Sequence, residues 1–268
     1  MPLLPSVVGK VLEITRKPDF SLRDLSNVIV TDQVITAQRL RHANSAYYGS
    51  SQEIKTSHQA VKLLGSQAVT NIVLALSLRS VGGGLGEFDS LRRALWKRSI
   101  FCAVVARSIA KSKKLDADLV FLCELLMDFG KIVLLAIIEE IIEIHPEYAD
   151  LPPSEIESVL EAFHLHAGSI VAEKWTLPTA VRESMTSHDA LDAAPEELRA
   201  PIAAASVGDF LACHLTNDLP LTDESKREVA REMADLEAAD ILRLSLAECS
   251  KLVDLRPKFE AFASELLA

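Results

Sequence analysis

Apolar residues recur three or four positions apart along almost the whole chain, which is the spacing of one face of an α-helix. In the first 80 residues the apolar runs are short, and polar breaks such as "KPDFS" and "NSAYYGSS" separate them. Ser21 and Thr56 are good N-caps for two of these runs. The pattern predicts an N-terminal bundle of about five helices within residues 1–80.

A glycine-rich stretch, "SVGGGLGEF", follows this predicted bundle. Four of the ten glycines lie within residues 82–86, a density that a helix interior does not tolerate well. We therefore expect a junction at residues 81–89, between an N-terminal helical subdomain (1–80) and a second helical subdomain (90–268). The two together would form one unit, with the C-terminal helices of residues 223–268 as an extension.

The second subdomain is predicted to consist of longer helices, because its apolar runs are longer and breaks between them are fewer. Ser154 and Glu157 have the spacing of a capping box and would open one of them. No β-type alternation of useful length is present, so the predicted fold class is all-α. The expected helices span about 90–111, 117–143, 154–162, 166–175, 178–187, 196–215, 223–236 and 246–267.

The most apolar of these predicted helices contains charges. Glu124, Asp128 and Lys131 are spaced four and three residues apart, so on one helix they would share a face. Charges in apolar surroundings are seldom left unpaired. We expect either a structural ion pair between Asp128 and Lys131 or a pocket at this face.

The composition of the chain indicates in which cellular compartment it acts and which kinds of partner it binds. Hydrophobic residues make up 49% of the chain and charged residues 25%, as in ordinary soluble proteins. The net charge of −10 argues against general affinity for nucleic acid. No secretory signal and no run long enough to span a membrane is visible, so we expect a cytoplasmic protein without membrane contact. The four cysteines are expected to be buried, reduced thiols: Cys102, Cys123, Cys213 and Cys249.

Residues 90–115 carry eight basic residues and no acidic one: Arg92, Arg93, Lys97, Arg98, Arg107, Lys111, Lys113 and Lys114. Arg107, Lys111 and Lys114 are expected on one helix face. Such a face is either solvated and balanced by acids elsewhere, or a docking surface for an acidic protein or nucleic acid. We keep it as a candidate docking face.

Histidines and aspartates in several helices are candidate metal ligands. His164 and His166 lie in one predicted segment, His188 and Asp189 in another, and Asp209 in a third. Together with Asp128 they could form a cluster of the kind that binds metal, but ligands scattered over separate helices are weak evidence by spacing alone. By pattern, His164 and His166 fit a helix cap and a surface group.

Several motifs occur in an order that resembles a known family. The most specific is "DQVITAQRLRHANSAYYGSSQEIKTSHQAVKLLG" (residues 32–65), with Gln33 where proline is usual. "LLMDFGKIVL" is similar to the Leu-Leu-His-Asp-Ile-Gly-Lys core of HD-type phosphohydrolases, and "HLHAGSIVAEKWTLP" and "ESMTSHD" follow it. The chain thus resembles the HDOD domain family, non-catalytic bacterial relatives of those enzymes. The resemblance runs from "LPSVVGKVLEI" to about Leu215.

The resemblance also implies where a metal site would lie. HD enzymes use four ligands, an early His, a His-Asp pair and a late Asp, and by position these fall on Arg98, Met127, Asp128 and Asp209. A thioether is a poor substitute for an imidazole, and a guanidinium would place a fixed positive charge where a dication sits. We therefore expect no bound metal, no cofactor and no catalysis. The expected vestigial pocket comprises Arg98, Met127, Asp128, Lys131, His164, His188 and Asp209.

The resulting expectation is a regulatory protein that acts in signal transduction through a protein partner. Two alternatives stay open at this point. One is a metal-dependent phosphohydrolase or phosphodiesterase acting on nucleotides or cyclic dinucleotides, although the motifs of other nucleophilic or nucleotide-binding enzymes are absent. The other is a sensor of a small nucleotide or of DNA.

Overall fold

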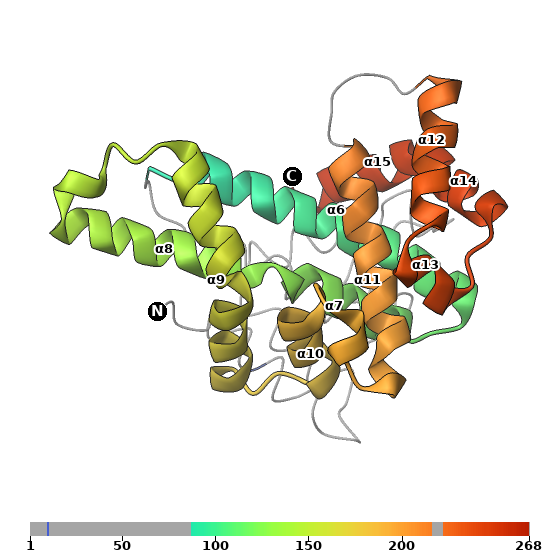
Figure 1. Cartoon of the computed structure of the whole chain (residues 1–268), viewed down its shortest axis with the longest axis horizontal. Coiled ribbons are helices and arrows are strands. Elements are labelled where there is room, and N and C mark those ends of the chain that lie inside the picture. Colours follow the sequence, from blue (N-terminus) through green and yellow to red (C-terminus); the bar gives the residue numbers. More distant parts are fainter. Residues whose placement is uncertain (1–9, 11–86, 216–221, 268) are drawn as a thin grey trace, which may run out of the picture. The chain divides into compact units, whose positions relative to one another are not determined.

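The structure is a computed structural model that describes Lys10 and residues 87–215 and 222–267. The predicted N-terminal bundle and most of the glycine-rich junction lie outside the described residues. In the described part every regular element is helical, which confirms the all-α fold class (Figure 1). The elements are α6 (Asp89–Lys113), α7 (Ala117–Met127), α8 (Phe129–Ile144), η1 (Pro146–Tyr148), α9 (Pro153–Lys174), α10 (Thr179–Ser187), η2 (Leu191–Ala193), α11 (Glu196–Leu215), α12 (Asp223–Ala234), α13 (Glu237–Leu242), α14 (Leu246–Asp254) and α15 (Arg256–Leu267).

Helix α7 is the centre of the packing, because it lies against α6, α10 and α11. Its sequence is apolar on all sides, as expected for a helix surrounded by others. Leu125 and Leu126 are fully buried there. Helices α6 and α11 approach closely at Gly208, where a Cβ atom would lie 2.8 Å from the main-chain oxygen of Cys102. This close approach brings the polar residues of α6 and α11 together beside α7.

Helices α8 and α9 form a hairpin that extends away from α7 (Figure 1). The hairpin has a small core of its own, formed by Leu135, Ile138, Ile156 and Leu160. Buried Arg92 of α6 ties it to the rest through two bonds of 2.8 Å to the carboxylate of Glu139. The hairpin is therefore a projecting but anchored part of the fold.

The helix predicted for residues 117–143 is in fact two helices, which corrects the expectation. Asp128 ends α7 and begins α8, with φ −93° and ψ 11°. Gly130, two residues after the break, makes a close contact with α9. A Cβ atom at Gly130 would overlap the main-chain oxygen of His164, so α8 begins in direct contact with the backbone of α9. Glu124 and Lys131 consequently face different neighbours and do not share one helix face.

Two further boundaries differ from the prediction. Helix α9 runs unbroken from Pro153 through the expected gap before His166, and it begins at Pro152 and Pro153 without the capping box predicted from Ser154. Proline suits the first helical turn because its missing N–H has no partner there in any case. The last predicted helix is divided near Leu255 into α14 and α15, and the short helix α13 was missed.

The candidate docking face must also be corrected. Arg107 is buried, with 7% of its surface exposed, and its guanidinium pairs with Asp118 at 2.9 Å. Lys114 ends the helix in a left-handed conformation (φ 59°), so it leaves the α6 surface. The three residues therefore do not form one exposed face, and docking by Lys111 and Lys114 stays a prediction. Other basic residues of α6 also pair with acids, as in Lys113–Glu248 at 2.7 Å.

The cysteine prediction is wrong at one position. Cys102, Cys123 and Cys249 are buried free thiols, but Cys213 is exposed. Among the described helices, none is both long and apolar enough to cross a bilayer.

Candidate functional site: a polar centre divided by the α7–α8 break

Two polar clusters lie near the α7–α8 break, and Asp128 at the break belongs to one of them. One cluster lies among α6, α7 and α11, and the other among the α7–α8 junction, α9 and α10. Each cluster contains three side chains whose donor atoms lie within 4.8 Å of one another. The members are Cys102, Glu124 and Asp209 in the first, and Asp128, His164 and His188 in the second.

An arginine, Arg98, pairs with the aspartate of the first cluster. Arg98 Nη2 lies 2.6 Å from Asp209 Oδ1, and Arg98 Nε lies 3.2 Å from the same oxygen. Arg98 Nη2 also donates to the sulfur of Cys213 at 2.9 Å. Burial by itself would lower the pKa of Arg98, but the charge and hydrogen bonds of Asp209 outweigh it and raise the pKa. Arg98 is thus a fixed cation that holds the α11 carboxylate.

Glu124 is the buried acid of this cluster. Only 2% of its surface is exposed, and its Oε2 has no hydrogen-bond partner among the described residues. Burial raises the pKa of Glu124 well above its ordinary value, and the nearby charges of Asp209 and Asp128 raise it further. Burial, together with Glu124 and Asp209, also raises the pKa of the Cys102 thiol. Glu124 and Cys102 are therefore held in their neutral, protonated forms.

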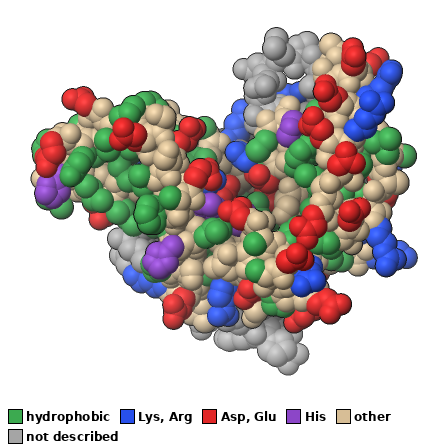
Figure 2. Space-filling model, viewed as in Figure 1, with side chains coloured by type: hydrophobic (Ala, Val, Ile, Leu, Met, Phe, Trp, Pro, Cys, Tyr) green, Lys and Arg blue, Asp and Glu red, His purple; other side chains and the backbone are tan. Residues whose placement is uncertain are grey.

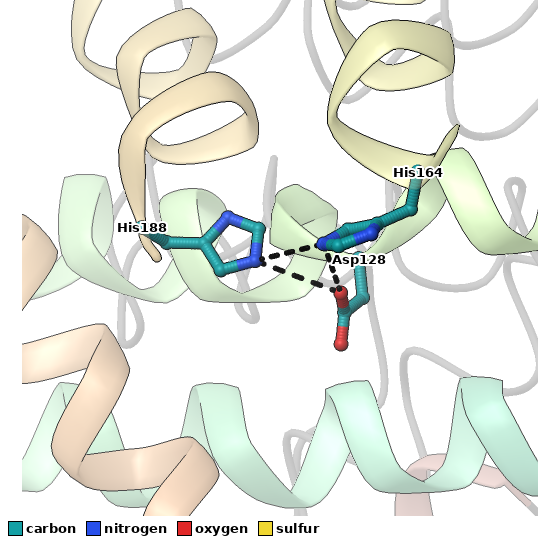
Figure 3. Close-up of side chains that lie close together, drawn as sticks. All are labelled: Asp128, His164 and His188. Carbon is teal, nitrogen blue, oxygen red and sulfur yellow. Dashed lines mark hydrogen bonds and ion pairs between the residues drawn. The ribbon is translucent and has the colours of Figure 1, made fainter. Parts of the chain in front are cut away.

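The second cluster places two imidazoles against a carboxylate, as Figure 3 shows. His164 Nε2 and His188 Nε2 are 3.3 Å apart, and each lies 3.8 Å from Asp128 Oδ1. His164 is 3% exposed, so the prediction that it caps a helix is wrong, whereas His166 is exposed as expected. Three separate elements therefore converge on one point.

Acidic and basic side chains surround this second cluster. Lys131 Nζ lies 3.3 Å from Asp128 Oδ1, as expected for the predicted ion pair, and 2.8 Å from Glu161 Oε1. Burial alone would lower the pKa of Lys131, but Asp128 and Glu161 raise it, so the side chain stays charged. Asp189, an exposed residue, has its carboxylate oxygens 3.4 Å from His188 Nε2 and 3.8 Å from His164 Nε2.

The seven residues of the predicted pocket are thus divided between the clusters. Arg98 and Asp209 meet in the first, whereas Asp128, Lys131, His164 and His188 meet in the second. Met127 is 3% exposed and is part of the hydrophobic core. Prediction from sequence named Asp189 beside His188 as a candidate ligand, but it missed Glu161 as a neighbour of the second cluster and Cys102 as a neighbour of Glu124. An i, i+3 relation to His164 was the only sequence signal for Glu161.

The four positions carried over from HD enzymes do not fit a metal ion. The Arg98 guanidinium donates twice to Oδ1 of Asp209, and the Met127 side chain offers only a soft thioether. Asp128 Oδ1 has no hydrogen-bond partner among the described residues, and Asp209 still contributes a donor oxygen to the first cluster. Of the positions that would hold a metal in an HD enzyme, Asp209 therefore pairs with the guanidinium of Arg98 here.

The chain belongs to the HDOD domain family, whose model matches residues 1–191. A curated relative, an uncharacterized protein of Treponema pallidum (strain Nichols), is 28% identical over 230 residues, which cover 81% of this chain and 44% of the relative. The chain therefore spans less than half the length of that relative.

Solved structures share the fold at low sequence identity. An HDOD domain protein with unknown function from Geobacter sulfurreducens superposes with a TM-score of 0.73 at 20% identity, covering 99% of this chain and 93% of that chain. A protein named as a candidate phosphohydrolase from Shewanella amazonensis SB2B gives 0.73 at 19%, covering 99% and 95%. A candidate signal transduction protein from Marinobacter aquaeolei VT8 gives 0.65 at 20%, covering 100% and 60%. These likenesses establish the fold alone.

Proposed function

We propose that this protein is a non-catalytic regulator in signal transduction that acts by binding a partner protein. The observation that carries the proposal is the contact between Arg98 and Asp209. A metal-dependent phosphohydrolase needs a cation that lowers the pKa of a bound water and neutralises developing phosphate charge. A guanidinium on Asp209 balances the carboxylate but has no open coordination position and cannot activate water.

The projecting hairpin supports the part of the proposal that concerns a partner. Its far end exposes apolar side chains, with Ile144 73% exposed and Tyr148 46% exposed. Phe163 and Val159 continue the apolar surface along α9, and Figure 2 shows apolar side chains gathered over this hairpin. Exposed apolar side chains gathered among charged ones are typical of a protein–protein interface.

A hydrolysis assay tests whether the protein is catalytically inactive. With Mn²⁺, Fe²⁺ or Zn²⁺ added, we expect the full chain to cleave bis(p-nitrophenyl) phosphate and cyclic dinucleotides no faster than the Asp128→Ala variant does. His166→Ala, an exposed change on α9, is the matched control for handling and metal carry-over. Metal-dependent turnover that persists in His166→Ala and disappears in Asp128→Ala would contradict the proposal.

Substitutions at the far end of the hairpin test whether its exposed apolar side chains bind a partner protein. Ile144→Lys removes exposed apolar surface at the C-terminal end of α8, where a positive charge suits the helix dipole and should leave folding intact. We expect a partner identified by affinity capture to bind this variant at least about tenfold more weakly, a loss of about 1.4 kcal/mol. Ala149→Lys adds the same charge at the same end without removing a large apolar group, and binding should persist. Equal binding by all three proteins would exclude this surface.

A further inference from the structure

The hairpin of α8 and α9 carries most of the apolar surface that the described helices leave exposed. Seven large apolar side chains are exposed in the described part of the chain, and six of them lie on this hairpin or on the turn that joins its helices. The six are Ile141, Ile144, Tyr148, Val159, Phe163 and Ile170. Single exposed apolar residues are ordinary, but their concentration on one projecting element marks a surface that another molecule covers.

The exposed apolar side chains of α9 form a stripe along one side of the helix. Val159, Phe163 and Ile170 lie four and seven residues apart, so their side chains point in similar directions. The stripe is separate from the hairpin core, to which the same helix contributes Ile156 and Leu160. The helix rises about 17 Å from one end of the stripe to the other. A partner helix of about three turns would match that length.

The hairpin also carries most of the net charge of the chain. Residues 132–173 contain nine acidic residues and no lysine or arginine, whereas the whole chain has a net charge of −10. This segment therefore has a formal charge of −9, and all the other residues together have −1. Figure 2 shows acidic and apolar side chains together over the hairpin. The nine acids are Glu139, Glu140, Glu143, Glu147, Asp150, Glu155, Glu157, Glu161 and Glu173.

Some of these acids have cationic partners within the fold, but most of the exposed ones do not. Glu139 pairs with Arg92, and Glu161 pairs with Lys131. Five exposed acids form no ion pair with any described residue: Glu140, Glu143, Asp150, Glu155 and Glu157. The apolar surface of the hairpin is therefore flanked by unbalanced negative charge, which a positively charged partner would neutralise.

The sign of this charge selects among the molecules that could cover the apolar side chains. Nucleic acid and anionic lipid surfaces are negative and would be repelled. A second copy bound face to face would bring two segments of charge −9 together, which costs free energy because like charges repel. Every regular element in the described part is helical, so no sheet edge is offered there to an extended peptide, whereas two packed helices provide grooves for a third.

We propose that the α8–α9 hairpin binds an amphipathic helix of a partner protein, with lysine or arginine on either side of the apolar face of that helix. The apolar face would cover the α9 stripe and the exposed end of α8, and the basic side chains would pair with the hairpin acids. Burial of the apolar side chains would supply most of the affinity, and the charges would supply specificity and the rate of association. The inference rests on the proposed regulatory function and names the chemistry of the partner.

A binding measurement on the full chain with two designed peptides tests the inference. One is a fluorescein-labelled peptide of about 14 leucine and lysine residues, with leucines at the spacing of one helix face, and the other has glutamate at each lysine position. In about 50 mM NaCl we expect the lysine peptide to bind saturably and at least about tenfold more tightly than the glutamate peptide. In about 0.5 M NaCl the difference should shrink, because the Debye length falls to about 4 Å.

Substitutions on the hairpin and a matched pair on α12 locate the binding surface. Glu140→Lys with Glu143→Lys should weaken binding of the lysine peptide about tenfold, and positive charges near the C-terminal end of α8 suit the helix dipole. Phe163→Gln should weaken binding by about the same factor, because it removes the aromatic side chain of the stripe. Glu228→Lys with Asp235→Lys makes the same change in net charge on α12 and at its C-terminal end, and it should alter binding by less than about twofold.

Equal binding of the two peptides, or equal effects of the charge reversals on the hairpin and on α12, would overturn the inference. Self-association of the chain that Phe163→Gln abolishes would overturn it in favour of a second copy. Binding to phosphatidylcholine vesicles containing phosphatidylserine that Phe163→Gln abolishes would overturn it in favour of a membrane. If Phe163→Gln fails to fold, the charge reversals at exposed positions still decide the question.

Failure of this inference is distinguishable from failure of the proposed function. An identified partner that binds wild type but not Ile144→Lys, together with equal binding of the two peptides, would support docking at the hairpin and overturn only the basic character of the partner. Metal-dependent hydrolysis would overturn the regulatory function whichever peptide binds. Preferential binding of the lysine peptide that the hairpin substitutions weaken supports both.

Discussion

Replacing Gly130 by alanine is expected to destabilise the fold by about 3 kcal/mol and to move His164 away from His188. Alanine is the better helix former and would gain about 0.5–1 kcal/mol in α8. The added Cβ atom would overlap the main-chain oxygen of His164, and a backbone atom of a packed helix cannot yield as a flexible side chain can. The steric cost therefore exceeds the gain, and α9 must shift.

Thermal and urea unfolding of the full chain measure this effect. A loss of about 3 kcal/mol corresponds to a fall of roughly 6–12 °C in the midpoint for a domain of this size. Glu140→Ala, at an exposed position of the same helix, should change stability by less than about 0.5 kcal/mol. A midpoint for Gly130→Ala equal to that of wild type would show that the α8–α9 contact is looser than described.

Replacing Glu124 by glutamine is expected to stabilise the protein relative to wild type, and to do so by more at pH 8 than at pH 5. The folded-state pKa of Glu124 is raised, so the native state keeps a proton that the unfolded state has lost above about pH 4.3. Wild-type stability from this group is therefore complete below that pH and is lost as the pH rises toward the folded-state pKa. Glutamine has nearly the same shape and does not ionise, so it removes the loss.

Urea unfolding at pH 5 and pH 8 measures the difference between variant and wild type. Each unit of pKa elevation within that window is worth about 1.4 kcal/mol, so we expect the variant to be more stable than wild type by more than about 1 kcal/mol at pH 8. Glu140→Gln, at an exposed position of α8, should show no such pH dependence. A constant difference between pH 5 and pH 8 would mean that Glu124 ionises normally in the folded state.

The parts of the fold that follow from periodicity were predictable. Helix α11 spans Glu196–Leu215 as expected, and α6 differs from its predicted span by one or two residues at each end. Both have long apolar faces and recognisable ends. Helix α7 and the start of α8 gave no such information, because a segment that is apolar on all sides has no periodicity from which a break could be read.

The break at Asp128 depends on a contact that is distant in sequence. Gly130 permits α8 to begin against the backbone of α9, and its partner His164 lies 34 positions further along the chain. Helix α9 was divided in the prediction because His164 and His166 are polar, although neither breaks a helix and no glycine or proline lies between them. A tertiary contact thus accompanies the first boundary, whereas the continuity of α9 agrees with its local propensity.

The candidate site was predictable as a set of residues but not as an arrangement. The resemblance predicted that Arg98, Asp128 and Asp209 form one centre. In the structure Arg98 pairs with Asp209, and Asp128 lies next to His164 and His188. Burial raises the pKa of Glu124. Burial depends on how the helices pack, and the spacing of residues in the sequence does not predict it. Asp189 was a candidate from the sequence because it follows His188, and the structure shows that it neighbours both imidazoles.

The α7–α8 break gives the hairpin the geometry of a lever. Helix α8 has 16 residues and is therefore about 24 Å long, with Asp128 at one end and the exposed Ile144 at the other. A tilt of about 5° at the break displaces the far end by about 2 Å, although the carboxylate at the pivot scarcely moves. Any such tilt would therefore be largest at the apolar end of the hairpin, beyond the Arg92–Glu139 pair that anchors α8 to α6.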